Sequence, residues 1–158
     1  MSPHHVPREI RYNFEYEHRL KACFIGAGGH AYRNVYPTFR YAPVDLAAIC
    51  DLSAERAADF ARIFGAERTY ADHREMLAAE HPEVVFIVTN YTDDGHVRAT
   101  ALARDCAEAG AHVWMEKPTA ATRAEVEDLI AVSSRTGRTI MTGLKKTFFP
   151  AIEKLNDI

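Results

Sequence analysis

Hydrophobic residues after position 20 are concentrated in short continuous runs rather than at alternating positions. Such runs are typical of strands that are covered on both faces, as in a parallel sheet. We therefore expect buried strands at residues 22–25, 46–50, 84–88, 113–115 and, more weakly marked, 139–141.

Helical periodicity and capping residues occupy the segments between these runs. Ser53 precedes an apolar stripe that ends at Gly65, and Thr122 with Glu125 has the spacing of a capping box. Strands alternating with helices predict an α/β fold, a doubly wound parallel sheet of about six strands in the order 3-2-1-4-5-6. Helices are expected over residues 31–41, 54–64, 72–77, 96–109 and 123–136, and an extended stretch over 10–16.

The composition is that of a soluble globular protein. Of the 158 residues, 47% are hydrophobic and 26% are charged, which excludes wholesale disorder and fibrous repeats. Lys and Arg number 19 against 22 acidic residues, so there is no basic excess of the kind that favours nucleic acid. No apolar run reaches the roughly 18 residues that a membrane span requires.

The start of the chain and its cysteines indicate a cytoplasmic protein without a metal. Residues 1–8 lack the apolar core of a signal peptide. The cysteines fit no zinc template and lie in apolar or helical segments, so we expect buried, reduced thiols. They are Cys23, Cys50 and Cys106.

A glycine-rich loop follows the first predicted strand directly. In this G-x-G-x-x-A pattern Gly26 permits the tight turn, Gly28 lets a pyrophosphate approach the backbone, and Ala31 lets the next helix pack closely. The start of that helix would offer free N–H groups to the anion. The loop consists of Gly26, Ala27, Gly28, Gly29, His30 and Ala31.

An acidic residue at the end of the second predicted strand strengthens this interpretation. Asp51 lies twenty residues after Ala31, where a carboxylate accepts hydrogen bonds from the adenosine ribose and repels a 2′-phosphate. NAD is therefore expected, with NADP as the weaker alternative because Arg56 is near enough to meet a 2′-phosphate. A purely structural turn with a helix-capping Asp51 is a second alternative. A third alternative is an S-adenosylmethionine site. Such sites usually have an acidic residue two positions before the first glycine, where this chain has Phe24.

A second polar motif ends the fifth predicted strand. Glu116, Lys117 and Pro118 stand where doubly wound folds place ligands. An ammonium group there can bind a substrate hydroxyl and help move its proton, and Glu116 could orient it. The alternative is a surface lysine in a turn.

Together these motifs resemble the Gfo/Idh/MocA oxidoreductases, named for glucose–fructose oxidoreductase and inositol dehydrogenase. The similarity covers residues 20–158 and includes His112–Pro118 and the Thr142-Gly-Leu segment. It implies an NAD(P)-dependent enzyme that oxidises or reduces a sugar, a cyclitol or a related small molecule. Lys117 matches the lysine at the reacting hydroxyl. Thr89, Asn90, His96 and Glu116 match positions near the cofactor, although residues 89–96 are longer than the family pattern and lack its proline.

The resemblance also implies a domain organisation. We expect an N-terminal arm at residues 1–19, an NAD(P)-binding Rossmann domain at 20–150, and at 151–158 the start of a second α/β domain, which this chain lacks. Family members of full length are expected to be homo-oligomers, and the isolated chain is expected to be inactive. The alternative is a stand-alone, non-catalytic NAD(H)-binding module or redox sensor.

Overall fold

Six parallel strands form one sheet in the described part of this chain. A computed structural model describes residues 11–144 and Lys154, and in it the strand order is β3-β2-β1-β4-β5-β6. Every neighbouring pair is parallel, which confirms the predicted fold class and order. The strands are β1 Leu20–Ile25, β2 Val44–Cys50, β3 Arg68–Tyr70, β4 Val84–Ile87, β5 His112–Met115 and β6 Ile140–Thr142.

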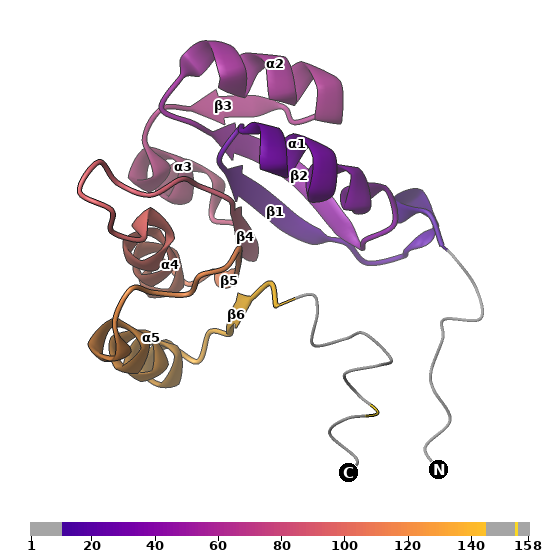
Figure 1. Ribbon diagram of the computed structural model, residues 1–158. Coiled ribbons are helices and arrows are strands. Elements are labelled where there is room, and N and C mark those ends of the chain that lie inside the picture. The colour runs from indigo at the N-terminus through magenta and orange to yellow at the C-terminus, as the bar shows by residue number, and fades with distance from the viewer. Residues whose placement is uncertain (1–10, 145–153, 155–158) are drawn as a thin grey trace.

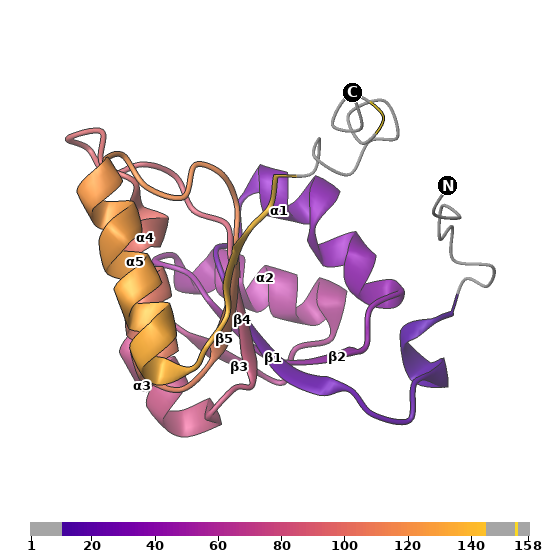
Figure 2. The same cartoon turned by 90° about the horizontal axis from the view of Figure 1, so that it is seen from below.

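Helices cover both faces of this sheet. Figures 1 and 2 show α1 and α2 on one face and α3, α4 and α5 on the other. Each face buries its own apolar cluster, one around Phe24, Tyr36 and Ile49 and the other around Val85, Ile87 and Met115. The helices are α1 Gly29–Asn34, α2 Ala54–Phe64, α3 His73–Glu80, α4 Arg98–Glu108 and α5 Arg123–Thr136, with short 3₁₀ helices η1 Asn13–Glu15 and η2 Tyr36–Arg40.

The capping residues read from the sequence begin and end the helices as predicted. The Ser53 side chain accepts a hydrogen bond from Arg56 N–H, and Thr122 with Glu125 forms a reciprocal capping box. Gly65 and Gly137 end α2 and α5 in the left-handed region, at φ 81° and 68°.

Two local predictions were wrong, and the start of one further helix, expected at about residue 96, is displaced by two residues. The helix expected over 31–41 divides into α1 and η2, because Pro37 has no N–H and clashes with the preceding helical turn. The helix expected from residue 96 begins at Arg98, since the preceding residues are held in a turn. The stretch expected to be extended contains the 3₁₀ helix η1. The side-chain amide of Asn13, in this helix, donates hydrogen bonds to the carbonyl oxygens of Ala42 and Val44.

The third strand was not among the runs that the sequence indicated. β3 has only three residues, two of them exposed, so it shows no apolar run. It is instead tied to α3 through Glu80, whose nearly buried carboxylate accepts hydrogen bonds from Arg68 and Tyr70. The helix expected to start within residues 151–158 lies outside the described part of the chain.

The three cysteines are free and buried, as predicted. Burial raises the pKa of the Cys23 and Cys50 thiols to about 12 and that of Cys106 further still. All three therefore stay protonated at neutral pH. No helix among the described residues is long and apolar enough to cross a bilayer.

Candidate functional site

The loop after β1 combines one crowded glycine with one that faces open space. Gly26 has φ 114°, and a Cβ on it would lie 1.9 Å from the Val88 carbonyl oxygen, so only glycine fits. Gly28 has an ordinary φ of −100°, and a Cβ there would meet nothing within 4 Å. The backbone at Gly28 is thus accessible to a ligand while Gly26 holds the loop against β4.

Asp51 fixes the same loop from the end of β2. Its Oδ2 accepts a hydrogen bond from Ala27 N–H at 2.7 Å, and its Oδ1 accepts from Ser53 N–H at 2.8 Å and from Arg56 Nη2 at 2.6 Å. Burial alone would raise the pKa of this carboxyl, but these three donors outweigh it and hold the pKa below its usual range. Asp51 is therefore an anion in direct contact with the glycine loop.

A cleft of about 650 Å³ opens at the carboxyl ends of β1, β2 and β4. This is the edge at which doubly wound sheets bind ligands. It brings together eight of the residues predicted from the sequence. They are Gly26, Ala27, Gly28, Gly29, Asp51, Arg56, Thr89 and Asn90.

A smaller cleft of about 280 Å³ adjoins the first one and reaches the end of β5. It shares Gly28, Gly29 and residues 88–91 with the larger cleft. The two clefts therefore meet along the glycine loop and the segment after β4. The predicted residues that line only the smaller one are His30, Ala31, Glu116 and Lys117.

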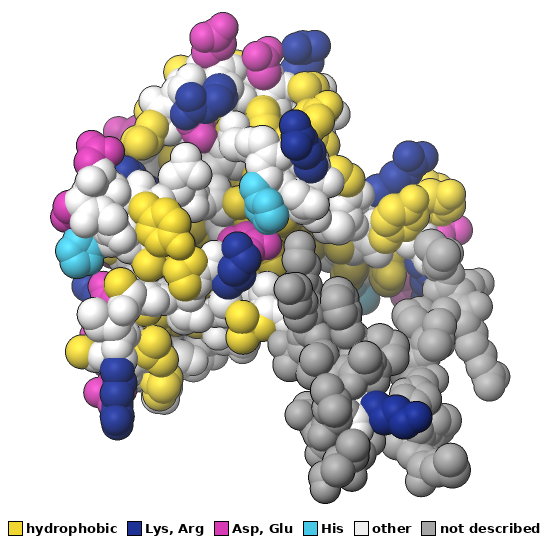
Figure 3. Space-filling view, in the orientation of Figure 1, with side chains coloured by type: hydrophobic (Ala, Val, Ile, Leu, Met, Phe, Trp, Pro, Cys, Tyr) yellow, Lys and Arg dark blue, Asp and Glu magenta, His cyan; other side chains and the backbone are white. Residues whose placement is uncertain are grey.

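Glu116 connects the two motifs that the sequence indicated separately. Its Oε1 lies 3.1 Å from His30 Nε2, and its Oε2 accepts from Lys117 N–H at 3.1 Å and faces Lys117 Nζ at 4.0 Å. The Glu116 side chain is only 13% exposed, whereas that of Lys117 is 62% exposed. Figure 3 shows a histidine, an acidic and a basic side chain adjoining one another near the middle of the face.

One buried polar atom between the clefts has no partner. The Thr89 hydroxyl oxygen is shielded from solvent and makes no hydrogen bond among the described residues. Such a group is costly unless a ligand or water satisfies it. Thr89 lines both clefts. With the open backbone at Gly28 and the anion at Asp51, this hydroxyl fits a polar ligand that spans both clefts.

His96 does not join the other predicted residues. It lines neither cleft, and its Nε2 lies 3.8 Å from Asp94 Oδ2 in the turn after β4. Sequence reasoning also missed residues that do line the larger cleft. Asp72 and His73 were not predicted to line the cleft, because they follow β3, which shows no apolar run. Arg98 and Leu102 were not predicted either, since α4 was expected to begin two residues earlier.

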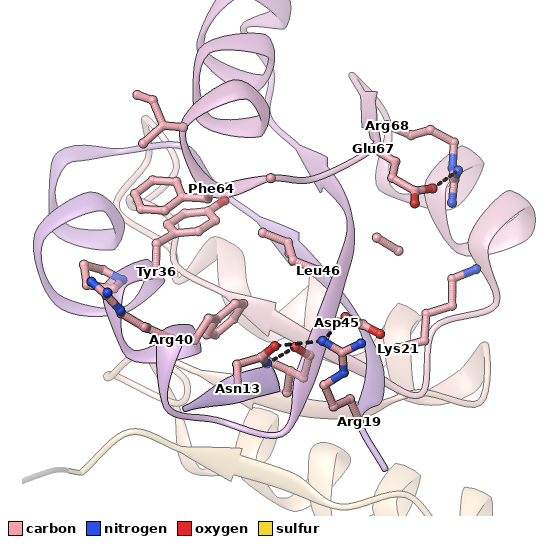
Figure 4. Close-up of a pocket in the computed structure, with 16 residues that line it drawn as sticks. Asn13, Arg19, Lys21, Tyr36, Arg40, Asp45, Leu46, Phe64, Glu67 and Arg68 are labelled. Atoms are coloured by element: carbon pink, nitrogen blue, oxygen red, sulfur yellow. Dashed lines mark hydrogen bonds and ion pairs between the residues drawn. The ribbon is translucent and has the colours of Figure 1, made fainter. Parts of the chain in front are cut away.

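A second cavity, of about 930 Å³, lies at the amino ends of β1, β2 and β3 (Figure 4). Tyr36 and Phe64 stack on one side of it, with ring centroids 4.5 Å apart. Three of its cations are already paired: Arg19 with Asp45, Lys21 with Glu80, and Arg68 with Glu67 and Glu80. The fourth, Arg40, lies over the Tyr12 ring.

Residues 20–144 match a sequence family described as an oxidoreductase family with an NAD-binding Rossmann fold, Gfo/Idh/MocA. D-apiose dehydrogenase from Paraburkholderia graminis is 31% identical over 135 residues, which cover 85% of this chain and 35% of that enzyme. The NADP(+)-dependent scyllo-inositol 2-dehydrogenase IolU from Bacillus subtilis is 32% identical over 110 residues, or 70% of this chain and 32% of that enzyme.

A solved structure supports the fold. The 3-ketoreductase from Actinomadura kijaniata, in complex with NADP and TDP-benzene, superimposes with a TM-score of 0.75 at 22% identity. The match covers 88% of this chain and 41% of that one. The chain spans about a third of the length of the two curated relatives.

Proposed function

Because this chain belongs to the Gfo/Idh/MocA oxidoreductase family, whose NAD-binding Rossmann domain its residues 20–144 match, we propose that the two adjoining clefts hold NAD(H). The observation that carries this proposal is the open backbone at Gly28 beside the anionic Asp51. Both lie on the edge of the sheet where dinucleotides bind. In this proposal the chain is the nucleotide-binding part of an NAD(P)-dependent oxidoreductase.

Each cleft would hold one half of the dinucleotide. The backbone of residues 26–31 would receive the pyrophosphate, and Asp51 the hydroxyls of the adenosine ribose. Thr89, Asn90 and Glu116 would line the nicotinamide half, where the unpartnered hydroxyl of Thr89 gains a hydrogen bond. That His96 contacts the cofactor stays a prediction, and it requires the turn that contains His96 to bring it to the cleft.

The charges at Asp51 favour NAD over NADP, though not overwhelmingly. The carboxylate would repel a 2′-phosphate, but Arg56 stands 2.6 Å from its Oδ1 and offsets part of the negative charge. One curated relative is an NADP(+) enzyme by name. NAD as the preferred cofactor, with weaker binding of NADP, fits these facts.

The proposed reaction is the interconversion of a hydroxyl and a carbonyl on a small molecule. When bound, the nicotinamide supplies the acceptor or donor of the hydride. Lys117, at the open end of the smaller cleft, would contact the reacting hydroxyl and carry its proton. The named relatives act on D-apiose and scyllo-inositol, which supports a sugar, cyclitol or related substrate. A cytoplasmic location and a homo-oligomeric full-length enzyme stay predictions from the sequence.

Turnover tests this proposal. We expect the 158-residue chain to oxidise no sugar or cyclitol measurably, because Lys117 is largely exposed and no described residue presses a substrate against it. We expect turnover from the longest polypeptide that its gene encodes, measured as NADH formation at 340 nm. There Lys117→Ala should lower kcat about 10²–10⁴-fold while the affinity for NAD changes little.

A normal kcat in that variant would show that Lys117 is a surface lysine with no part in the proton transfer. If that longest polypeptide binds NADH and turns over no polyol, the protein is the alternative, a binding module without catalysis.

A further inference from the structure

We propose that His30 is a positioning residue for Lys117, acting through Glu116. His30 belongs to the glycine loop and Glu116 to the motif after β5, so the contact between them joins residues 86 positions apart. The inference rests on the proposed function, in which Lys117 lies at the reacting end of the site. It assigns to His30 a role in addition to being part of the loop.

Neighbouring groups fix the tautomer of the His30 ring. The Asn34 amide nitrogen lies 3.1 Å from the His30 carbonyl oxygen and 3.3 Å from His30 Nδ1. A carbonyl only accepts, so the NH₂ group of Asn34 faces both atoms and Nδ1 is an acceptor. The ring proton is then on Nε2, which donates to Glu116 Oε1 at 3.1 Å.

Glu116 transmits this contact because its carboxylate is planar and nearly buried. Fixing Oε1 against His30 fixes the direction of Oε2, which accepts the N–H of Lys117 and faces its ammonium at 4.0 Å. Glu116 is the one carboxylate among the described residues that line the smaller cleft, and besides Glu116, His30 and Lys117 the one titratable group there is Tyr91. The orientation of Glu116 therefore decides whether its carboxylate faces the Lys117 ammonium.

A merely local role for the pair makes a different prediction. The His30 side chain is 45% exposed, and exposed pairs contribute little to stability. If the His30–Glu116 contact has no effect beyond these two side chains, removing it leaves the environment of Lys117 unchanged. The reactivity of the Lys117 amine distinguishes the two interpretations without any cofactor or substrate.

Amine acylation read by peptide mass spectrometry measures that reactivity. In the 158-residue chain at neutral pH, Glu116→Gln should raise the labelling rate of Lys117 about fivefold relative to Lys21, because the Lys117 amine loses the carboxylate that faces it at 4.0 Å and is freer to meet the reagent. His30→Leu should raise it about two- to threefold, because the carboxylate loses its fixed direction. Lys21 is the internal control, since its partner Glu80 is far from these changes.

Conservative variants complete the design. His30→Gln keeps an N–H donor for Glu116 and should restore a rate near that of the wild type. Asn34→Ala should shift the rate in the same direction as His30→Leu, by less. Circular dichroism checks the fold of each variant. Long-range ¹H–¹⁵N spectra of the wild type should show the Nε2–H tautomer of His30.

An unchanged Lys117 rate in a folded His30→Leu variant, or an Nδ1–H tautomer in the wild type, overturns the proposal. A His30→Gln variant that labels like His30→Leu does so as well, because the donated hydrogen bond would then carry no effect. An NADH titration of the same proteins tests the proposed function separately. If the wild type binds no NADH, the proposed function is wrong. The labelling rates of Lys117 still test whether His30 positions Glu116.

Discussion

At the scale of single residues, Asp51 is engaged before any nucleotide reaches it. Three donors, two of them backbone N–H groups, hold its two oxygens. A carboxylate has about four acceptor positions, so one is left for a ribose hydroxyl. The donors also keep Asp51 ionised, and an amide in its place would lose the charge together with the hydrogen bonds that one of the two oxygens accepts.

Asp51→Asn should narrow the preference for NAD over NADP about tenfold, because it removes the charge that repels the 2′-phosphate and keeps one of the two acceptor oxygens. Arg56→Ala should widen the preference, since it removes the nearest cation. Fluorescence titration of both variants with NADH and NADPH gives the ratios. A ratio that is unchanged in Asp51→Asn would show that this charge takes no part in the selectivity.

The sequence predicted the residues whose role depends on their immediate neighbours. The crowding at Gly26 and the opening at Gly28 follow from a strand–loop–helix pattern that local spacing reveals. The contact between His30 and Glu116 and the unpartnered Thr89 hydroxyl depend on how β1, β4 and β5 are placed side by side. The predicted strand order sets these strands side by side, but it does not say which of their side chains meet.

At the scale of elements, a nearly buried carboxylate ties β3 to its neighbours. The Glu80 side chain is 2% exposed and receives Arg68 Nη2 at 2.8 Å, the Tyr70 hydroxyl at 2.6 Å and Lys21 Nζ at 3.1 Å. The hydrogen bonds from Arg68, helped by Tyr70 and Lys21 and opposed by burial, lower the pKa of Glu80 from 4.5 to about 2. The carboxylate joins β1, β3 and α3.

This lowered pKa predicts how stability responds to acid. The unfolded chain binds a proton at Glu80 more readily than the folded one, so this contribution is complete above about pH 4.5 and is lost as the pH falls toward about 2. Glu80→Gln should lower the free energy of unfolding at pH 7 by about 1–3 kcal/mol, since its partners are part-exposed and become hydrated. The variant should also lose stability less steeply in acid.

Urea unfolding between pH 3 and pH 7 measures both effects. Glu127→Gln is the matched control, because it changes an exposed pair on α5 whose contribution is under about 1 kcal/mol. Equal acid slopes in the wild type and Glu80→Gln would show that the carboxylate does not stabilise β3 through its charge.

Helix prediction succeeded where side chains supply the caps and failed where the backbone is interrupted. Ser53 and Thr122 mark their helices by chemistry that depends only on residues three positions away. The interruption at Pro37 was foreseeable, because proline does not continue a helix. β3 was not foreseeable from apolar runs, since its stabilising partner Glu80 lies on the following helix.

At the scale of the whole molecule, the helices on both faces of the sheet leave its carboxyl edge as the place for the candidate site. Helices close both faces, so the carboxyl edge is where the glycine loop, Asp51, Thr89 and Lys117 converge. The larger cavity at the amino ends has three cations that carboxylates neutralise and a fourth, Arg40, that lies over the Tyr12 ring. The open backbone at Gly28 and the unpartnered Thr89 hydroxyl, rather than volume, distinguish the candidate cofactor site.

The central claim is that NAD(H) binds beside Gly28, and an NADH titration of two variants tests it directly. Gly28→Leu places a side chain where a Cβ meets nothing within 4 Å, so folding should be unaffected while the pyrophosphate is blocked. Ala79→Leu, on the exposed surface of α3, is the control. We predict that the wild type and Ala79→Leu bind NADH equally and that Gly28→Leu binds at least about tenfold more weakly, with an unchanged unfolding midpoint. Equal NADH affinity in Gly28→Leu, or no binding by the wild type, would contradict the account.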